Sequence, residues 1–304
     1  MEDCIIIGGG PAGLTAAIYL ARFHLSIRLF DCGSSRAAQI PRTHNHAGYP
    51  GGIPGPDLLR LMLEQAESFG VAREPLRVSR LERTGDGSFL LRAGPDETAF
   101  TARTVLLATG VENHRPPIDD TIHQEALNRG LLRYCPICDG YEVTDKRVGV
   151  IGTGDHGMRE ALFLRGFTRD VTLVAPGARH ELDPACRAAL DEAGIVHLDG
   201  PCAELAIDGE EIVVPTAAGE LRFDSVYPAL GSRIRSGLAV RAGAAASADG
   251  CLEVDDHQRT SIPGLFAAGD VVKGLDQISH AMGEAGVAAT TIRNLLAEMR
   301  PLRR

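Results

Sequence analysis

Two glycine-rich segments, each directly after an apolar run, constrain the fold of this chain more than any other feature. The first is Gly8–Gly13 (GGGPAG) after Cys4–Ile7, and the second is Gly152–Gly157 (GTGDHG) after Arg147–Ile151. Each segment precedes a predicted helix and a predicted second strand, over 14–23 and 27–30 in the first copy and over 158–166 and 171–174 in the second. Strand, glycine turn, helix and strand together are typical of a dinucleotide-binding βαβ unit.

The first copy carries every residue that such a unit needs. Gly8 allows the tight turn, Gly10 lets backbone amides approach a pyrophosphate, and Gly13 lets the helix and the strand pack closely. The helix N-terminus supplies free N–H donors and partial positive charge for the phosphates. Asp31 follows Gly13 by 18 residues and can accept both ribose hydroxyls of an adenosine. We therefore predict a dinucleotide site here.

The second copy lacks the residues that usually select a nicotinamide. The position 18 residues after Gly157 holds Ala175, where NADH binding would need a carboxylate and NADPH binding a basic residue. Arg179 and His180 follow a Pro-Gly turn, and they either reach a phosphate or are solvated loop residues. The predicted second nucleotide site comprises Gly152, Gly154, Asp155, His156, Gly157, Arg179 and His180.

A chain of 304 residues is long enough for about two domains of ~150 residues. Buried strands at 104–110 and 263–270 and a long helix at 279–299 read as parts of the first domain, and Asp270 ends a strand at the edge where ligands of open α/β sheets bind. The predicted fold class is α/β, with two Rossmann-like, doubly wound domains. The first comprises 1–116 and 243–304, and the second, 117–242, is inserted into it.

Charge and composition exclude several classes of function. Lys and Arg number 31 against 40 Asp and Glu, a net charge of −9 without a basic stripe, so neither nucleic acid nor an anionic membrane is an expected partner. No signal peptide and no apolar run of the ~18–20 residues that a membrane helix needs is recognisable. Seven cysteines, an odd number, favour a reducing compartment, and we predict a cytoplasmic location.

A pair of cysteines carries the expected chemistry. Cys135 and Cys138 lie in YCPICDGY at 134–141. A structural zinc site would need four ligands, and no second CxxC or His-x₃-His pattern completes one, so no metal is predicted. The sequence favours a redox-active dithiol, and a pair of inert buried cysteines is the alternative. Asp139 can move the proton that a leaving thiolate requires, or serve as a turn or N-cap residue.

These motifs together resemble the low-molecular-weight thioredoxin reductases, which are two-domain FAD and NADPH enzymes, over essentially the whole chain. The resemblance implies that Cys138 faces the flavin, that Cys135 attacks the substrate and that Asp139 is the acid/base. It also implies a homodimer. The implied FAD-binding residues are Gly8, Gly10, Pro11, Ala12, Gly13, Asp31, Gln39, Asn45, Thr109, Gly110, Gly269, Asp270, Gln277 and Ile278.

Four departures from the family pattern bear on the electron donor. The segment 175–180 replaces the family's basic motif, Asp276 replaces the usual Arg before Gln277, Ala37-Ala38 replaces a glycine pair before Gln39, and Pro136 in the dithiol motif is less usual for the NADPH enzymes. The leading hypothesis is an FAD-dependent disulfide oxidoreductase that acts on thioredoxin or a similar dithiol, with ferredoxin or a second FAD in place of NADPH. The alternatives are a conventional NADPH-dependent thioredoxin reductase, an oxygen-dependent small-molecule dithiol oxidase and a non-enzymatic flavoprotein redox sensor.

Overall fold

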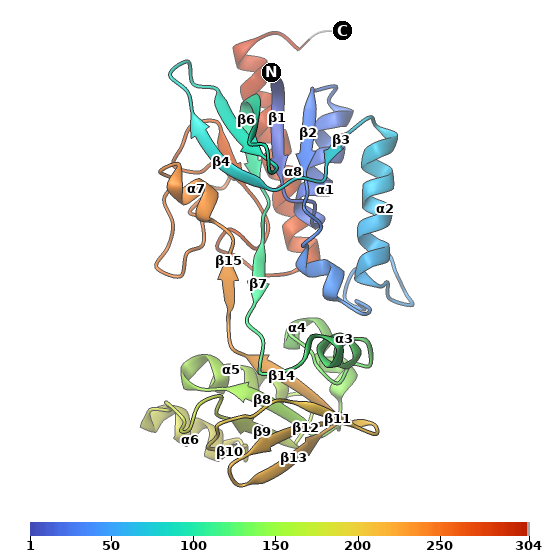
Figure 1. The fold of residues 1–304 in the computed structure, drawn as a ribbon, viewed down its shortest axis with the longest axis vertical. Helices are drawn as coiled ribbons and strands as arrows, with labels where there is room; N and C mark the ends of the chain where they lie inside the picture. The colour runs from blue at the N-terminus through green and yellow to red at the C-terminus, as the bar shows by residue number, and fades with distance from the viewer. Residues whose placement is uncertain (303–304) are drawn as a thin grey trace. The chain divides into compact units, whose positions relative to one another are not determined.

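The computed structural model describes residues 1–302, and the chain divides into two compact units (Figure 1). Unit 1 comprises Met1–Gln39, Pro54–Glu112 and Ile234–Arg304, and unit 2 comprises Ile40–Ile53 and Asn113–Arg233. The second unit is therefore interrupted as well as inserted. The sequence predicts domain boundaries at 116/117 and 242/243, whereas the two units meet at 112/113 and 233/234. The domain boundaries stay a prediction.

A seven-stranded sheet forms the centre of unit 1, in the order β3-β2-β1-β6-β5-β4, with β16 paired to β6. Its strands are β1 Glu2–Ile7, β2 Ile27–Phe30, β3 Ala72–Glu74, β4 Val78–Arg83, β5 Phe89–Ala93, β6 Thr98–Leu107 and β16 Leu265–Ala267. β1 pairs in parallel with both β2 and β6, and Asp3–Ile7 are buried. Burial along a continuous apolar run is what a parallel strand covered on both faces requires.

Helices cover one face of this sheet, and α1 lies among them (Figure 1). The helices of unit 1 are α1 Pro11–Arg22, η1 Arg36–Gln39, α2 Gly55–Ser68, α7 Gly237–Arg241 and α8 Ile278–Met299. α1 contacts both α8 and α2. Small residues permit this close packing, since Gly286 of α8 lies beside Tyr19 of α1. These contacts pack α1 against the rest of unit 1.

Unit 2 contains a parallel sheet in the order β10-β9-β8-β14 and a three-stranded antiparallel sheet, β11-β12-β13. Its strands are β8 Val148–Gly152, β9 Val171–Val174, β10 Val196–Leu198, β11 Ala206–Asp208, β12 Glu211–Thr216, β13 Gly219–Phe223 and β14 Ser225–Ala229. Its helices are α3 Asp120–Asn128, α4 Pro136–Asp139, η2 Gly140–Val143, α5 Gly154–Leu164 and α6 Pro184–Glu192. Two short strands pair with each other where the chain passes from one unit to the other: β7 Val111–Asn113 and β15 Ser232–Ile234.

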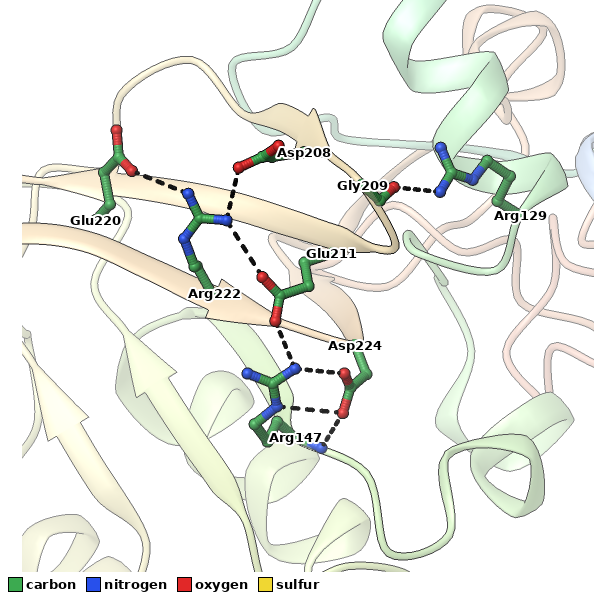
Figure 2. Close-up of polar contacts among 8 residues, drawn as sticks. All are labelled: Arg129, Arg147, Asp208, Gly209, Glu211, Glu220, Arg222 and Asp224. Atoms are coloured by element: carbon green, nitrogen blue, oxygen red, sulfur yellow. Dashed lines mark hydrogen bonds and ion pairs between the residues drawn. The ribbon is translucent and has the colours of Figure 1, made fainter.

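A network of ion pairs ties the start of β8 to the antiparallel sheet (Figure 2). The guanidinium of Arg147 lies 2.7 Å from both Asp224 Oδ1 and Glu211 Oε1. Glu211 also pairs with Arg222 at 3.2 Å, and Arg222 pairs with Asp208 at 2.7 Å. These side chains are partly exposed, so the network stabilises the surface of unit 2 without closing a buried site.

The predicted α/β class with two Rossmann-like domains is confirmed. Unit 1 has a mixed sheet in which β3, β2, β1, β6 and β16 are parallel and β5 and β4 add antiparallel pairs, and unit 2 has a parallel sheet. The strands predicted at 27–30 and 171–174 match β2 and β9. The predicted helix starts were wrong. α1 begins at Pro11 rather than 14, and α5 begins at Gly154 rather than 158. Each helix starts inside its glycine motif, because Pro is well tolerated at the first helical position and glycine lets the first turn lie against the strand. Among residues 1–302, no helix has both the length and the apolar character to span a membrane.

Candidate redox centre and dinucleotide sites

The first glycine motif, Gly8–Gly13, joins β1 to α1, and its backbone packs closely against neighbouring backbone atoms. Gly8 has a φ of +115°, and a Cβ there would overlap the carbonyl oxygen of Ala108. A Cβ on Gly13 would overlap the carbonyl oxygen of Gly8, and one on Gly9 would overlap the carboxylate of Asp31. Because the first N–H groups of a helix have no partner within it, this geometry leaves backbone donors at the end of β1 for a pyrophosphate.

Asp31 stands at the end of β2 with its carboxylate fixed. Its Oδ1 accepts a hydrogen bond from the Gly33 amide at 3.0 Å, and its Oδ2 accepts one from Arg73 at 3.1 Å. The absent side chain of Gly9 leaves room beside this carboxylate. The motif and Asp31 together therefore fit the pyrophosphate and the adenosine ribose of FAD.

Asp270 follows β16 and is held by a residue that the sequence analysis missed. The guanidinium of Arg36 lies 2.8 Å from Asp270 Oδ2 and 3.2 Å from Asp276 Oδ2. Burial, with the nearby charge of Asp270, raises the pKa of Asp276. Glu284 of α8 accepts a hydrogen bond from the Gly269 amide at 2.7 Å. Arg36 thus supplies positive charge beside Asp276, the position where the family usually has an Arg.

The other predicted FAD-binding residues divide between the units. Gln39 ends η1, Gln277 caps α8, Ile278 begins α8, and the hydroxyl of Thr109 donates to the Arg235 carbonyl at 2.7 Å. Asn45 belongs to unit 2, where its Oδ1 accepts a hydrogen bond from Thr43 at 2.9 Å. The structure groups Gly8–Gly13, Asp31, Gln39, Thr109, Gly110, Gly269, Asp270, Gln277 and Ile278 in unit 1. Their roles in cofactor binding stay predictions.

The second glycine motif, Gly152–Gly157, repeats this construction between β8 and α5. A Cβ on Gly152 would lie 2.8 Å from Ala229 Cβ, and one on Gly157 would lie 2.8 Å from the carbonyl carbon of Gly152. Gly154 has a φ of +62° and starts α5. Asp155 and His156 lie in the exposed first turn of that helix. The backbone here fits a second pyrophosphate.

The loop after β9 folds against this motif and uses its polar groups internally. Ala175 is fully buried. The amide of His180 donates to Asp199 Oδ1 at 2.9 Å, and its Nδ1 lies 3.3 Å from the hydroxyl of Thr153, the N-cap residue of α5. Burial lowers the pKa of His180, which favours the neutral ring. His180 is therefore an anchored, uncharged side chain, whereas Arg179 is exposed.

Cys135 and Cys138 form a disulfide bond with a Cα–Cα distance of 5.2 Å. Cys135 is the N-cap residue of α4, and its sulfur accepts a hydrogen bond from the Cys138 amide at 3.1 Å. Pro136 occupies the first helical position, where its missing N–H costs nothing. The CxxC spacing thus places both sulfurs at a helix N-terminus, an environment that favours thiolate. The described residues contain no group of three side chains that could hold a metal ion.

Asp139, the residue after Cys138, is held by two side chains on its two oxygens. Arg133 donates to Oδ2 at 2.9 Å, and the hydroxyl of Tyr227 donates to Oδ1 at 2.9 Å. Burial raises the pKa of Asp139, and Arg133 and Tyr227 oppose that rise. Arg133 is close enough in sequence to have been noticed, but Tyr227 gave no signal in the sequence.

Comparison with known proteins decides the family. Residues 2–285 match the family model described as pyridine nucleotide-disulphide oxidoreductase. The chain belongs to this family. Thioredoxin reductase from Listeria innocua serovar 6a is 31% identical over 312 residues, which cover 98% of this chain and 95% of that protein.

Solved structures of thioredoxin reductases are also similar to this chain. That from Streptococcus pyogenes MGAS5005 has a TM-score of 0.87 and 29% identity, covering 98% of this chain and 99% of the other. The atypical thioredoxin reductase from Desulfovibrio vulgaris Hildenborough has a TM-score of 0.56 and 31% identity, covering 99% and 100%. The predicted resemblance to low-molecular-weight thioredoxin reductases is confirmed, and the chain is an FAD-dependent disulfide oxidoreductase.

Proposed function

We propose that this pyridine nucleotide-disulphide oxidoreductase exchanges electrons between FAD, the Cys135–Cys138 pair and a small protein dithiol or disulfide of the thioredoxin type. The similarity to thioredoxin reductases over 98% of the chain supports this partner class. Gly8, Gly10, Gly13 and Asp31 would hold FAD, whose chemistry when bound is the two-electron oxidation or reduction of a dithiol. Thioredoxin itself is the substrate we propose first.

The chemistry of the cysteine pair is thiol–disulfide exchange. In the reducing direction, the Cys135 thiolate attacks one sulfur of the substrate disulfide, and the substrate's other sulfur leaves as a thiolate and takes a proton. The Cys138 thiolate then attacks the Cys135 sulfur, which releases the second substrate thiolate and forms the Cys135–Cys138 disulfide. Two protons move from the enzyme dithiol to the substrate dithiol, and Asp139 is the residue that we propose to transfer them.

We further propose that the electron donor is not NADPH but ferredoxin or a second flavin. One observation carries this proposal. Where a 2′-phosphate would need a cation, the buried Ala175 follows β9, and His180 is an uncharged side chain whose backbone amide is bound to Asp199. The exposed Arg179 is the remaining basic residue in this loop. The similarity to an atypical thioredoxin reductase is consistent with this proposal.

Anaerobic titration of the FAD-loaded protein tests the donor. The flavin absorbance near 450 nm is followed while NADPH and then NADH are added, with dithionite as the control and with a count of flavin per chain. We expect dithionite to bleach the flavin and both nicotinamides to fail. A count near two flavins per chain would then identify a second flavin, and a count near one would favour ferredoxin. Rapid bleaching by micromolar NADPH would overturn the proposal in favour of a conventional reductase.

A further inference from the structure

The two side chains that donate hydrogen bonds to the Asp139 carboxylate, Arg133 and Tyr227, both lie outside the CxxC motif. We propose that Arg133 and Tyr227 are positioning residues that hold the carboxylate of Asp139, the residue after Cys138, in one orientation for proton transfer. The inference rests on the proposed role of Asp139 in proton transfer. It assigns an influence on this proton transfer to two residues outside the CxxC motif, one of which lies on β14.

The two donors fix the carboxylate from different parts of unit 2. Arg133 lies in the segment before α4, and its own position is set by a hydrogen bond from Nε to the Gly130 carbonyl at 3.0 Å. Tyr227 lies on β14, is fully buried, and has its hydroxyl 2.9 Å from Asp139 Oδ1 and 3.2 Å from the Asp139 carbonyl oxygen. One strong donor on each carboxylate oxygen leaves the side chain a single orientation.

The charges around Asp139 oppose one another. Burial and the charge of Glu142 in η2 both disfavour the ionised carboxylate, and the guanidinium of Arg133 and the hydroxyl of Tyr227 both favour it. Helix α5 also contacts α4. Among its titratable side chains, Asp155 pairs with Arg159 at 2.8 Å, and Nε2 of His156 lies 3.3 Å from Oε1 of Glu160, whose pKa burial raises to about 7. The balance at Asp139 therefore depends on Arg133 and Tyr227.

An ionised Asp139 matters when a thiol attacks the disulfide. The attacking thiol gives its proton to Asp139 as its sulfur bonds to one cysteine sulfur and the Cys135–Cys138 bond breaks. Asp139 then gives the proton to the thiolate that leaves, so that protons and electrons balance within the exchange. A protonated Asp139 cannot accept the first proton, and the rate must therefore fall as pH drops through the pKa of this carboxyl.

The test uses the FAD-loaded, full-length protein with dithiothreitol as the probe dithiol, because this reaction needs no nicotinamide. Flavin bleaching is followed anaerobically by stopped flow between pH 4.5 and 8. Tyr227→Phe removes only the hydroxyl, and Arg133→Met removes the charge at similar length. We expect both variants to move the acid limb of the rate profile upward by about one pH unit. Arg133→Lys keeps a cation and should leave the limb near its wild-type pH.

Asp139→Asn separates this inference from the proposed function. We expect the rate of this variant to follow only the fall of about tenfold per pH unit in the thiolate of dithiothreitol, without the additional acid limb that Asp139 causes. If it keeps the limb at the wild-type pH, the acid–base role of Asp139 fails, and the inference fails with it. If the limb is lost in Asp139→Asn but stays in place in Tyr227→Phe and Arg133→Met, only the inference is overturned. Equal far-ultraviolet circular dichroism and equal Tm in all variants show that they are folded, because flavin content reports on unit 1 and the three residues lie in unit 2.

Discussion

The hydroxyl of Tyr227 lies 2.9 Å from Oδ1 of Asp139, although 88 residues separate them in the chain. Asp139 belongs to the CxxC segment, and Tyr227 belongs to β14 of the parallel sheet. Burial raises the pKa of Tyr227, so its hydroxyl remains a donor throughout the range in which the carboxyl titrates. The sheet of unit 2 therefore supports Asp139, the residue next to the redox pair, through the hydroxyl of Tyr227.

The first glycine motif predicts a sharp effect of a single methyl group on cofactor content. Gly13→Ala would place a Cβ on the Gly8 carbonyl oxygen, and the backbone of β1 cannot move away because it is paired on both sides. We expect purified Gly13→Ala to lose at least about nine-tenths of its FAD, as measured by the ratio of absorbance at 450 nm to that at 280 nm.

Gly283→Ala is the matched control for this variant. Gly283 lies inside α8, and a Cβ there would meet nothing within 4 Å among the described residues. Alanine is also the better helix former by about 1 kcal/mol. Flavin content equal to the wild type is expected. Loss of FAD in both variants would show that the effect is not specific to the motif.

Because Glu160 is largely buried, we expect the free energy of unfolding to depend on pH through its carboxyl group. Burial raises the pKa of Glu160 to about 7, and its neighbour His156, at 3.3 Å, is too exposed to cancel this effect. A carboxyl whose pKa is raised in the folded state contributes stability below its unfolded pKa, and that contribution is lost as pH rises through 7. We expect Glu160→Gln to raise the Tm by about 3 °C at pH 8 and not to raise it at pH 5. An equal rise at both pH values would contradict this explanation.

The ion-pair network of Figure 2 predicts the opposite pH dependence. The hydrogen bond from Arg147 lowers the pKa of Asp224, so its contribution to stability is present above the unfolded pKa of about 3.8 and is lost as pH falls through the lower folded value. Arg147→Met should lower the Tm by about 2 °C at pH 7 and pH 5, and by less at pH 3 or in 1 M salt.

Arg187→Met serves as the control for the network. Arg187 is an exposed residue of α6 and makes no ion pair with the part of the chain that the structure describes. Its replacement should leave the Tm unchanged at every pH. If Arg187→Met and Arg147→Met behave alike, the network contributes nothing beyond the loss of one positive charge.

The five cysteines outside the disulfide predict a wide spread of reactivity. Burial raises the pKa of Cys4 to about 12 and that of Cys202 to about 11, whereas Cys32 is exposed. Because the thiolate is the reactive form, iodoacetamide should label Cys32 at least about 100 times faster than Cys4 in the native protein. Peptide mapping by mass spectrometry measures both rates, and urea should abolish the difference. Comparable native rates would contradict the burial of Cys4.

The sequence predicted the parts of the fold that depend on local pattern. The strands at 27–30 and 171–174 were located to the residue, because short apolar runs between polar turns are typical of buried parallel strands. The helix starts were misplaced, because glycine and proline usually interrupt helices, and here they begin them. Local pattern gave no sign that 40–53 would group with unit 2.

In the candidate site, too, the residues that follow a local sequence pattern were predicted, and their distant partners were not. The glycine motifs and the CxxC pair are contiguous in sequence, and each was recognised. The polar partners of other site residues come from distant parts of the chain: Arg36 for Asp270, Tyr227 for Asp139 and Asp199 for His180. These contacts depend on how the sheet brings distant segments together, so no spacing rule could have found them.

Trapping of a mixed disulfide tests the central claim, thiol–disulfide exchange at Cys135 and Cys138, most directly. Cys138→Ser and Cys135→Ser, both carrying Cys32→Ser to remove the exposed thiol, are incubated with a bacterial thioredoxin that keeps one active-site cysteine, activated as a mixed disulfide with thionitrobenzoate, and are analysed by mass spectrometry. We predict a stable adduct at Cys135 in Cys138→Ser with release of thionitrobenzoate, because neither protein keeps a second active-site sulfur that would release thioredoxin, and no adduct in Cys135→Ser. An adduct in Cys135→Ser alone, or no adduct in either variant, would contradict the account.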